Sequence, residues 1–148
     1  MELQWLRNLY GHTVSIDTAP LIYFVEEHPK YRDAVTPFFQ SADAGHLDVV
    51  TSMITLVEVL VHPYRRENES LAKEYTDILL HAPHVHAHAL TAIVAQEAAR
   101  LRAKWNMKTP DAIQLATATC TKATAFLTND TGFPDIPGLD MILLDDII

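Results

Sequence analysis

Short β-branched runs alternate along this chain with longer stretches whose apolar positions recur at helical spacing. Five short runs predict strands, at 14–16, 48–51, 84–89, 125–128 and 141–144. The stretches between them have apolar residues three or four positions apart, which favours helices. Strands that alternate with helices predict a parallel sheet covered on both faces. We therefore expect a three-layer α/β/α fold with a central, mainly parallel sheet of about five strands.

Turn and cap residues predict where the helices begin and end. Thr18 is a candidate cap for the helix after the first strand, and Gly45 is typical of the position after a helix end. Ser52 opens a helix that Pro63 is expected to stop. Thr109, followed by proline, predicts the cap of a later helix that runs to about residue 121.

Composition fits one folded domain over residues 1–148, with 1–12 as an N-terminal extension before the first strand. The chain is 49% hydrophobic and 20% charged, which argues against disorder. No apolar run is long enough to cross a bilayer, and the N-terminus lacks the features of a signal peptide. Cys120 is the only cysteine, so no intrachain disulfide can form. We expect a cytoplasmic protein without a membrane partner.

Four acidic residues occupy positions that an open α/β sheet would bring together. Asp17 and Asp130 directly follow predicted strands, and ligands bind beyond the carboxyl ends of parallel strands. Asp111 lies in the first turn of a predicted helix, where the helix dipole favours a carboxylate. Glu58 lies in an almost wholly apolar helix. All four can reach one pocket.

Each acid taken alone has a simpler interpretation, as a helix cap, a turn residue or a solvated charge. A cluster of carboxylates repels itself, and a hard divalent cation relieves that repulsion. Mg²⁺ is bound in proteins by carboxylate oxygens and water. The net charge of −8 counts against nucleic acid as a partner, although a bound cation would neutralise part of it.

The segments around the four acids resemble the acidic motifs of PIN-domain ribonucleases, especially the VapC-like toxins of type II toxin–antitoxin pairs. The resemblance covers about residues 14–144, and its motifs are Ser15-Ile16-Asp17-Thr18, Thr55-Leu56-Val57-Glu58-Val59, Thr109-Pro110-Asp111-Ala112-Ile113 and Leu127-Thr128-Asn129-Asp130. It implies an endoribonuclease that needs Mg²⁺ or Mn²⁺ to hydrolyse phosphodiester bonds of RNA. It also implies an antitoxin partner and a homodimer.

The resemblance assigns roles to individual residues. Asp17, Glu58 and Asp111 match the core metal ligands, and Asp130 matches a fourth acid, so these four are the expected catalytic and metal-binding residues. The expected supporting polar residues are Thr18, Ser52, Thr128 and Asn129.

Positive charge near the expected site is local. Arg100, Lys104 and Lys108 are spaced by four, which predicts one helix face that leads toward Asp111. We interpret them as candidate contacts to substrate phosphates. The alternative is ordinary solvated helix charge.

Two other enzyme-like patterns are weaker. His81, His84, His86 and His88 form a cluster whose last three members share one strand face, a possible transition-metal site or simply an exposed strand face. Phosphatases of the haloacid-dehalogenase type also use an aspartate after the first strand, but their pattern needs a second aspartate where this chain has Ala19.

Two further possibilities stay open. A nuclease-like fold can serve as a non-catalytic RNA- or protein-binding module, although the presence of all four acids argues against it. The apolar residues Leu3, Trp5, Leu6 and Leu9 suggest that the N-terminal extension packs on the domain or on a partner.

Overall fold

The computed structural model describes residues 3–148. Its centre is a five-stranded sheet in which every paired strand is parallel, in the order β3-β2-β1-β4-β5. The strands are β1 (Thr13–Ile16), β2 (Asp48–Ser52), β3 (Val85–His88), β4 (Ala125–Thr128) and β5 (Asp140–Leu143). The expected parallel sheet is confirmed, and all five strands end at the same edge.

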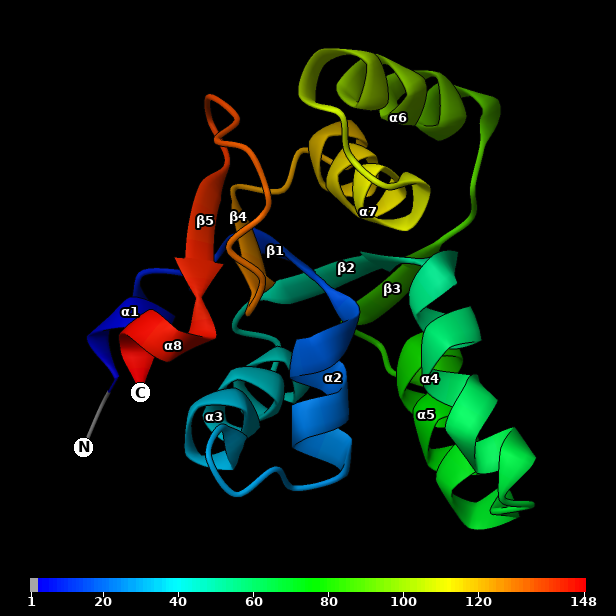
Figure 1. The fold of residues 1–148 in the computed structure, drawn as a ribbon. Coiled ribbons are helices and arrows are strands. Elements are labelled where there is room, and N and C mark those ends of the chain that lie inside the picture. Colours follow the sequence, from blue (N-terminus) through cyan, green and yellow to red (C-terminus); the bar gives the residue numbers. More distant parts are fainter. Residues whose placement is uncertain (1–2) are drawn as a thin grey trace.

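Helices cover both faces of this sheet and complete the three expected layers (Figure 1). Helices α2, α3, α4 and α5 lie on one face, α6 and α7 lie on the other, and the short α1 and α8 flank the end near β5. The helices are α1 (Gln4–Arg7), α2 (Thr18–Val25), α3 (Arg32–Asp43), α4 (Met53–Arg65), α5 (Glu69–His81), α6 (Ala92–Trp105), α7 (Thr109–Cys120) and α8 (Leu144–Ile147).

The core consists of two apolar clusters, one on each face of the sheet. Val14, Val49 and Leu127 belong to the cluster under α2, α3 and α5. Val50 and Phe126 belong to the cluster under α6 and α7. Alternate residues of one strand point to opposite faces, so neighbours such as Val49 and Val50 enter different clusters. Burial on both faces explains why these strands read as continuous apolar runs.

Several helix boundaries agree with the sequence, and one cap differs. Gly45 has a φ of +83° directly after the α3 C-cap, as a glycine beyond a helix end should. Asp17, not Thr18, caps α2, and its carboxylate accepts the Thr18 backbone N–H at 2.9 Å. The prediction for Thr18 was wrong because the helix begins at Thr18 itself, directly after Asp17.

Two further boundaries were predicted wrongly, both at prolines. Helix α4 continues through Pro63 to Arg65, where the missing N–H costs one bond and the buried ring packs in the core. Helix α7 begins at Thr109, and Lys108 is its N-cap. Its proline therefore lies in the first turn, where backbone N–H groups have no helical partner.

The N-terminal segment packs on the domain. Leu6 and Leu9 are buried in the same cluster as β1, and the Trp5 ring lies 6.4 Å from that of Phe38. The first of the two interpretations of this segment is confirmed. Within residues 3–148, no helix combines the length and apolar character needed to cross a membrane.

Candidate active site

Asp17 and Asp130 lie beside each other because β1 and β4 are neighbouring strands. Ile16 pairs with Leu127, so strands β1 and β4 leave the sheet at the same level. The Thr128 hydroxyl donates to Asp17 Oδ2 at 2.9 Å, and its oxygen accepts the Asp130 backbone N–H at 3.0 Å. Thr128 therefore joins the two strand ends.

Asp111 reaches the same edge from α7. Burial raises its pKa above the usual 3.8, and the charges of Asp17 and Asp130 raise it further, while Lys108 opposes the shift. Burial also raises the pKa of Asp17, against hydrogen bonds from Thr18 and Thr128 that lower it, and the Asp130 charge adds to the rise. Charges act in this way only over short distances, so Asp111 lies near Asp17 and Asp130 at this edge.

Glu58 joins them through Thr18. The Thr18 hydroxyl donates to Glu58 Oε1 at 2.9 Å, and its backbone N–H binds Asp17. The helix around Glu58 is apolar, as the sequence indicated, but the Glu58 side chain is exposed at the rim. One threonine thus bridges the acids of two elements.

A buried polar layer lies beneath the acids, and sequence reasoning missed most of it. Thr51, Thr55 and Gln114 are buried and hydrogen-bonded to one another, to Thr18 and to the backbone of Ser52. One signal was available: Gln114 and Thr55 each lie one helical turn from an acid, on faces that otherwise carry apolar residues. The predicted Ser52 contributes a backbone donor, and its hydroxyl caps α4 by accepting the Ile54 N–H at 3.1 Å.

Asn129 bonds away from the acids. Its Nδ2 donates to the Tyr31 hydroxyl at 2.9 Å, and that hydroxyl donates to Asp145 Oδ1 at 2.6 Å. Asn129 Oδ1 is buried without a hydrogen-bond partner. Asn129 therefore ties the loop after β4 to α3 and α8.

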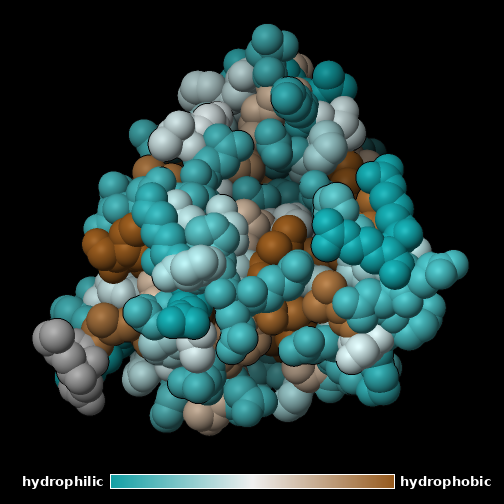
Figure 2. All heavy atoms as spheres, turned by 60° about the horizontal axis from the view of Figure 1, so that its bottom comes forward, coloured by the Kyte–Doolittle hydropathy of each residue, from teal (hydrophilic) through white to brown (hydrophobic). Residues whose placement is uncertain are grey.

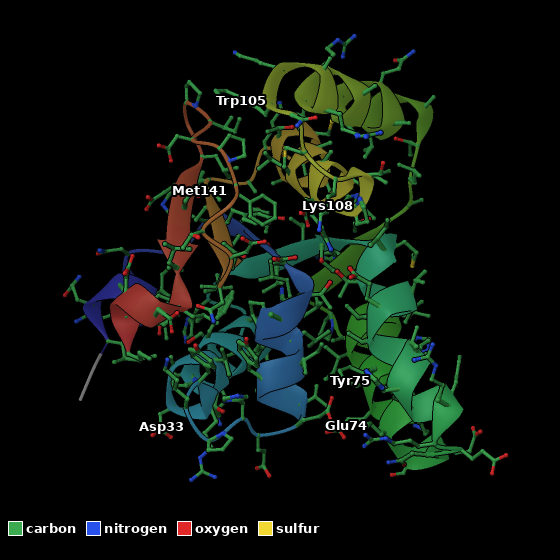
Figure 3. The ribbon with its side chains drawn as sticks, viewed as in Figure 1. Asp33, Glu74, Tyr75, Trp105, Lys108 and Met141 are labelled. Carbon is green, nitrogen blue, oxygen red and sulfur yellow. The ribbon has the colours of Figure 1, made fainter. Side chains whose placement is uncertain are left out.

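The three basic candidates do not share one helix face. Helix α6 ends at Trp105, and Asn106 has a left-handed φ of +54°, so Lys108 belongs to the start of α7. Arg100 pairs with Glu97 at 3.3 Å, and the Lys104 ammonium lies over the Trp105 ring. In Figure 3, Lys108 lies on the side of α7 nearer the sheet. Of the three, only Lys108 influences the pKa of a site acid.

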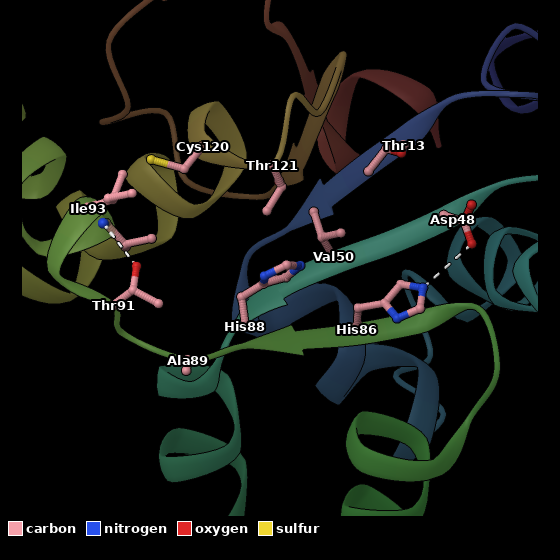
Figure 4. A pocket seen from close by; sticks show the side chains of 11 residues that line it. Thr13, Asp48, Val50, His86, His88, Ala89, Thr91, Ile93, Cys120 and Thr121 are labelled. Atoms are coloured by element: carbon pink, nitrogen blue, oxygen red, sulfur yellow. Dashed lines mark hydrogen bonds and ion pairs between the residues drawn. The ribbon is translucent and has the colours of Figure 1, made fainter.

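The histidine cluster lies elsewhere and is divided: His81 ends α5, His84 precedes edge strand β3, and His86 and His88 lie on that strand. His84 Nδ1 and His86 Nε2 approach Asp48 Oδ1 at 3.1 and 3.7 Å. His86 and His88 line a pocket of about 450 Å³, and both side chains are exposed (Figure 4). In residues 3–148, no group of three or more histidine, cysteine or acidic side chains is arranged to hold a metal ion. This geometry favours the exposed strand face over a transition-metal site.

The four rim acids suit a hard cation by the type of their donor atoms, although their present positions do not form a complete metal site. Asp17, Glu58, Asp111 and Asp130 offer oxygen donors only, which suits Mg²⁺ or Mn²⁺. No salt bridge within residues 3–148 neutralises any of them. As placed they form no three-ligand group, so a cation would have to draw them closer. The residues fit the ion by donor type, and repulsion from neighbouring aspartates contributes to the raised pKa of Asp17 and of Asp111.

Comparison with known proteins supplies the family. The family model of the PIN domain matches residues 14–139, whereas no curated protein is significantly similar in sequence.

Solved structures with this fold include VapBC2 from Rickettsia felis bound to a promoter DNA fragment, which is 17% identical with a TM-score of 0.64 over 87% of this chain and 96% of the other. DNA-bound VapBC from Salmonella typhimurium is 15% identical with a TM-score of 0.64, over 90% and 98% of the two chains. A toxin–antitoxin complex from Klebsiella pneumoniae is 22% identical with a TM-score of 0.60, over 85% and 94%. The match over most of the chain confirms the resemblance seen in the acidic motifs, and the chain belongs to the PIN domain family.

Proposed function

We propose that residues 1–148 form a single nuclease domain, a metal-dependent endoribonuclease that hydrolyses RNA phosphodiester bonds at the rim of the sheet. The observation that carries this proposal is the meeting of three aspartates at one edge of the sheet, with Glu58 joined to them through Thr18. The charge of Asp130 raises the pKa of Asp17, and the charges of Asp17 and Asp130 raise the pKa of Asp111. Membership in the PIN domain family supports the reaction class.

Asp17, Glu58, Asp111 and Asp130 would hold one or more Mg²⁺ or Mn²⁺ ions. Such an ion supplies an activated water and relieves negative charge on the phosphate. The chain's own residues prepare the carboxylates for this task. Thr128 donates to Asp17 Oδ2, and Thr18 donates to Glu58 Oε1, so each holds a particular carboxylate oxygen.

RNA binding requires local positive charge in a chain of net charge −8. Lys108 is the basic candidate whose charge acts on a site acid, so we assign it to a phosphate beside the metal. Arg100 and Lys104, already engaged with Glu97 and Trp105, would contribute to RNA binding more weakly.

An antitoxin partner is supported by the structural neighbours, which are VapBC and toxin–antitoxin complexes. The face formed by α2, α3 and α5 has apolar side chains between polar ones (Figure 2). A pocket of about 420 Å³ there has Phe24, Phe39 and Ile78 in its lining and Asp43 and Glu74 beside them. An amphipathic basic segment of an antitoxin made in the same cytoplasm would match this combination.

Homodimerisation is supported by an apolar stripe on α4. Val57, Val61 and Tyr64 recur at helical spacing with exposed fractions of 65%, 38% and 61%. The same helix carries Glu58, so a second copy docked there would lie close to the active site. Val57→Glu is expected to convert a dimer to a monomer in sedimentation, and a wild-type monomer would contradict the assignment.

The deciding experiment offers purified protein a structured RNA and p-nitrophenyl phosphate, with Mn²⁺ or with a chelator. We expect cleavage of RNA alone, with Mn²⁺ alone, and a loss of at least about 100-fold in Asp17→Asn. Phosphate-ester hydrolysis without RNA cleavage would support the phosphatase alternative. RNA binding without cleavage would support the non-catalytic module.

A further inference from the structure

Gln114 occupies an unusual position for a polar side chain. It is 1% exposed and lies on α7, one turn beyond Asp111. Its amide contacts groups from α2, β2 and α4, the elements that carry or adjoin Asp17 and Glu58. A buried amide is costly unless its donors and acceptor are all satisfied, and here they are.

The backbone of Ser52 fixes which way the amide faces. The Ser52 N–H can only donate, and it lies 3.2 Å from the Gln114 oxygen Oε1. The amide nitrogen Nε2 therefore faces the other way, 2.8 Å from Thr55 Oγ1 and 3.4 Å from Thr18 Oγ1.

This orientation sets the direction of each threonine proton. Nε2 can only donate, so Thr55 accepts from it and donates its own proton to Thr51, 2.7 Å away. Thr51 then donates to the Ile16 carbonyl at 2.9 Å, which can only accept. By the same reasoning, Thr18 accepts from Nε2 and donates to Glu58 Oε1 at 2.9 Å. At one end of these hydrogen bonds Gln114 Nε2 can only donate, and at the other end the Ile16 carbonyl can only accept. The direction of each hydrogen bond between them is therefore determined.

We propose that Gln114 is a positioning residue for the nuclease reaction. It holds the Thr18 hydroxyl in the one orientation that donates to Glu58, so the Glu58 carboxylate stays beside Asp17 before substrate binds. Gln114 touches neither Glu58 nor the solvent at the rim, and it acts through Thr18. This inference rests on the proposed nuclease function.

The test compares Gln114→Met, which keeps the side-chain length and removes the amide, with Thr117→Val as a matched control. Thr117 is equally buried on the same helix, and its hydroxyl bonds only the Ile113 carbonyl. We expect Gln114→Met to lower kcat about 10- to 100-fold with little change in KM, the scale for groups that orient metal ligands. Thr117→Val should keep wild-type kcat.

A double variant separates positioning from general weakening. Thr18→Val alone should lower kcat as much as Gln114→Met does. The double variant should lower kcat no further than Thr18→Val alone, since both substitutions remove the same hydrogen bond between Gln114 and Thr18. Multiplying losses, or wild-type kcat in Gln114→Met, would overturn the proposal.

A second measurement does not depend on activity or on the folding of variants. In metal-free wild-type protein, NMR should detect an exchange-protected Thr18 hydroxyl proton close to the Glu58 side chain. A Thr18 hydroxyl that exchanges freely with solvent would reject the assigned network. If the wild type shows this proton but never cleaves RNA with Mn²⁺, the network stands and the nuclease function fails.

Discussion

The hydroxyl of Thr128 and the carboxylate of Asp17 are joined by a hydrogen bond of 2.9 Å, although 111 positions separate them in the sequence. The same hydroxyl oxygen accepts the backbone N–H of Asp130 at 3.0 Å. One side chain thus fixes the relative placement of two acids from neighbouring strands, and it lowers the pKa of Asp17 against the effect of burial.

Thr128→Val should therefore impair the site while preserving the shape of the strand. It leaves Asp17 Oδ2 and the Asp130 N–H without their partner, at a cost of about 1–3 kcal/mol in unfolding free energy. RNA cleavage should fall about 10- to 100-fold. Thr128→Ser keeps the hydroxyl and should retain most activity in the same assay. Equal activity of the valine and serine variants would show that the bond is dispensable.

Asp111→Asn should stabilise the metal-free protein at neutral pH, even as it abolishes cleavage. The pKa of Asp111 is raised in the folded state, so the unfolded chain loses the proton first and ionisation favours unfolding. This penalty is absent below the usual pKa of 3.8 and complete above the raised folded value.

The gain should be modest because Asp111 is partly solvated and its repulsion is screened. We expect a few tenths of a kcal/mol, or about 1–2 °C in Tm at low salt. The Tm difference between Asp111→Asn and wild type should grow as pH rises from about 3 and then level off. A difference that shrinks with rising pH would contradict the assigned repulsion.

Mn²⁺ should stabilise the wild-type protein through the rim acids. An ion that binds only the folded protein adds about 2.7 kcal/mol at 100 times its Kd. Wild-type Tm should rise with millimolar Mn²⁺ in calorimetry, and Asp17→Asn should lose most of the rise. Asp77→Asn is the matched control, since Asp77 pairs with Lys73 on α5 away from the rim. An equal rise in all three proteins would place the ion elsewhere.

Lys108→Glu should weaken RNA binding more than Lys104→Glu. Both reversals change the net charge equally, but only Lys108 acts on a site acid, whereas Lys104 lies over Trp105. Loss of one phosphate contact should lower the slope of log K against log salt by about 1. Fluorescence anisotropy with a catalytically inactive Asp17→Asn background measures this directly. Identical slopes for the two reversals would remove Lys108 from the binding surface.

Tyr31→Phe should loosen the loop after β4. The Tyr31 hydroxyl accepts from Asn129 and donates to Asp145, so its removal leaves two polar groups without their partner. We expect a loss of about 1–2 kcal/mol in denaturant unfolding. Tyr23→Phe is the control, because its ring stacks on Tyr31 at 4.5 Å in the same environment. A comparable loss in the control would mean that the destabilisation is not specific to the hydroxyl that joins Asn129 and Asp145.

The sequence by itself determined the elements and the general location of the acids. Apolar runs such as Phe126–Leu127 must be buried, and burial on two faces requires a parallel sheet with helices on both sides. In such a sheet, residues that follow strand ends share one edge, so the positions of Asp17 and Asp130 along the chain place both at that edge.

Only the tertiary structure decided which side chains meet. The strand order puts β4 beside β1 and so brings Thr128 to Asp17, and the α6–α7 turn separates Lys108 from the helix face predicted for it. The contact between Gln114 and Thr55 could not be predicted, because hydrogen bonds between distant segments leave no periodic pattern in a sequence. Periodicity reports burial, which is local and averaged over many residues, whereas the site depends on single contacts between elements far apart along the chain.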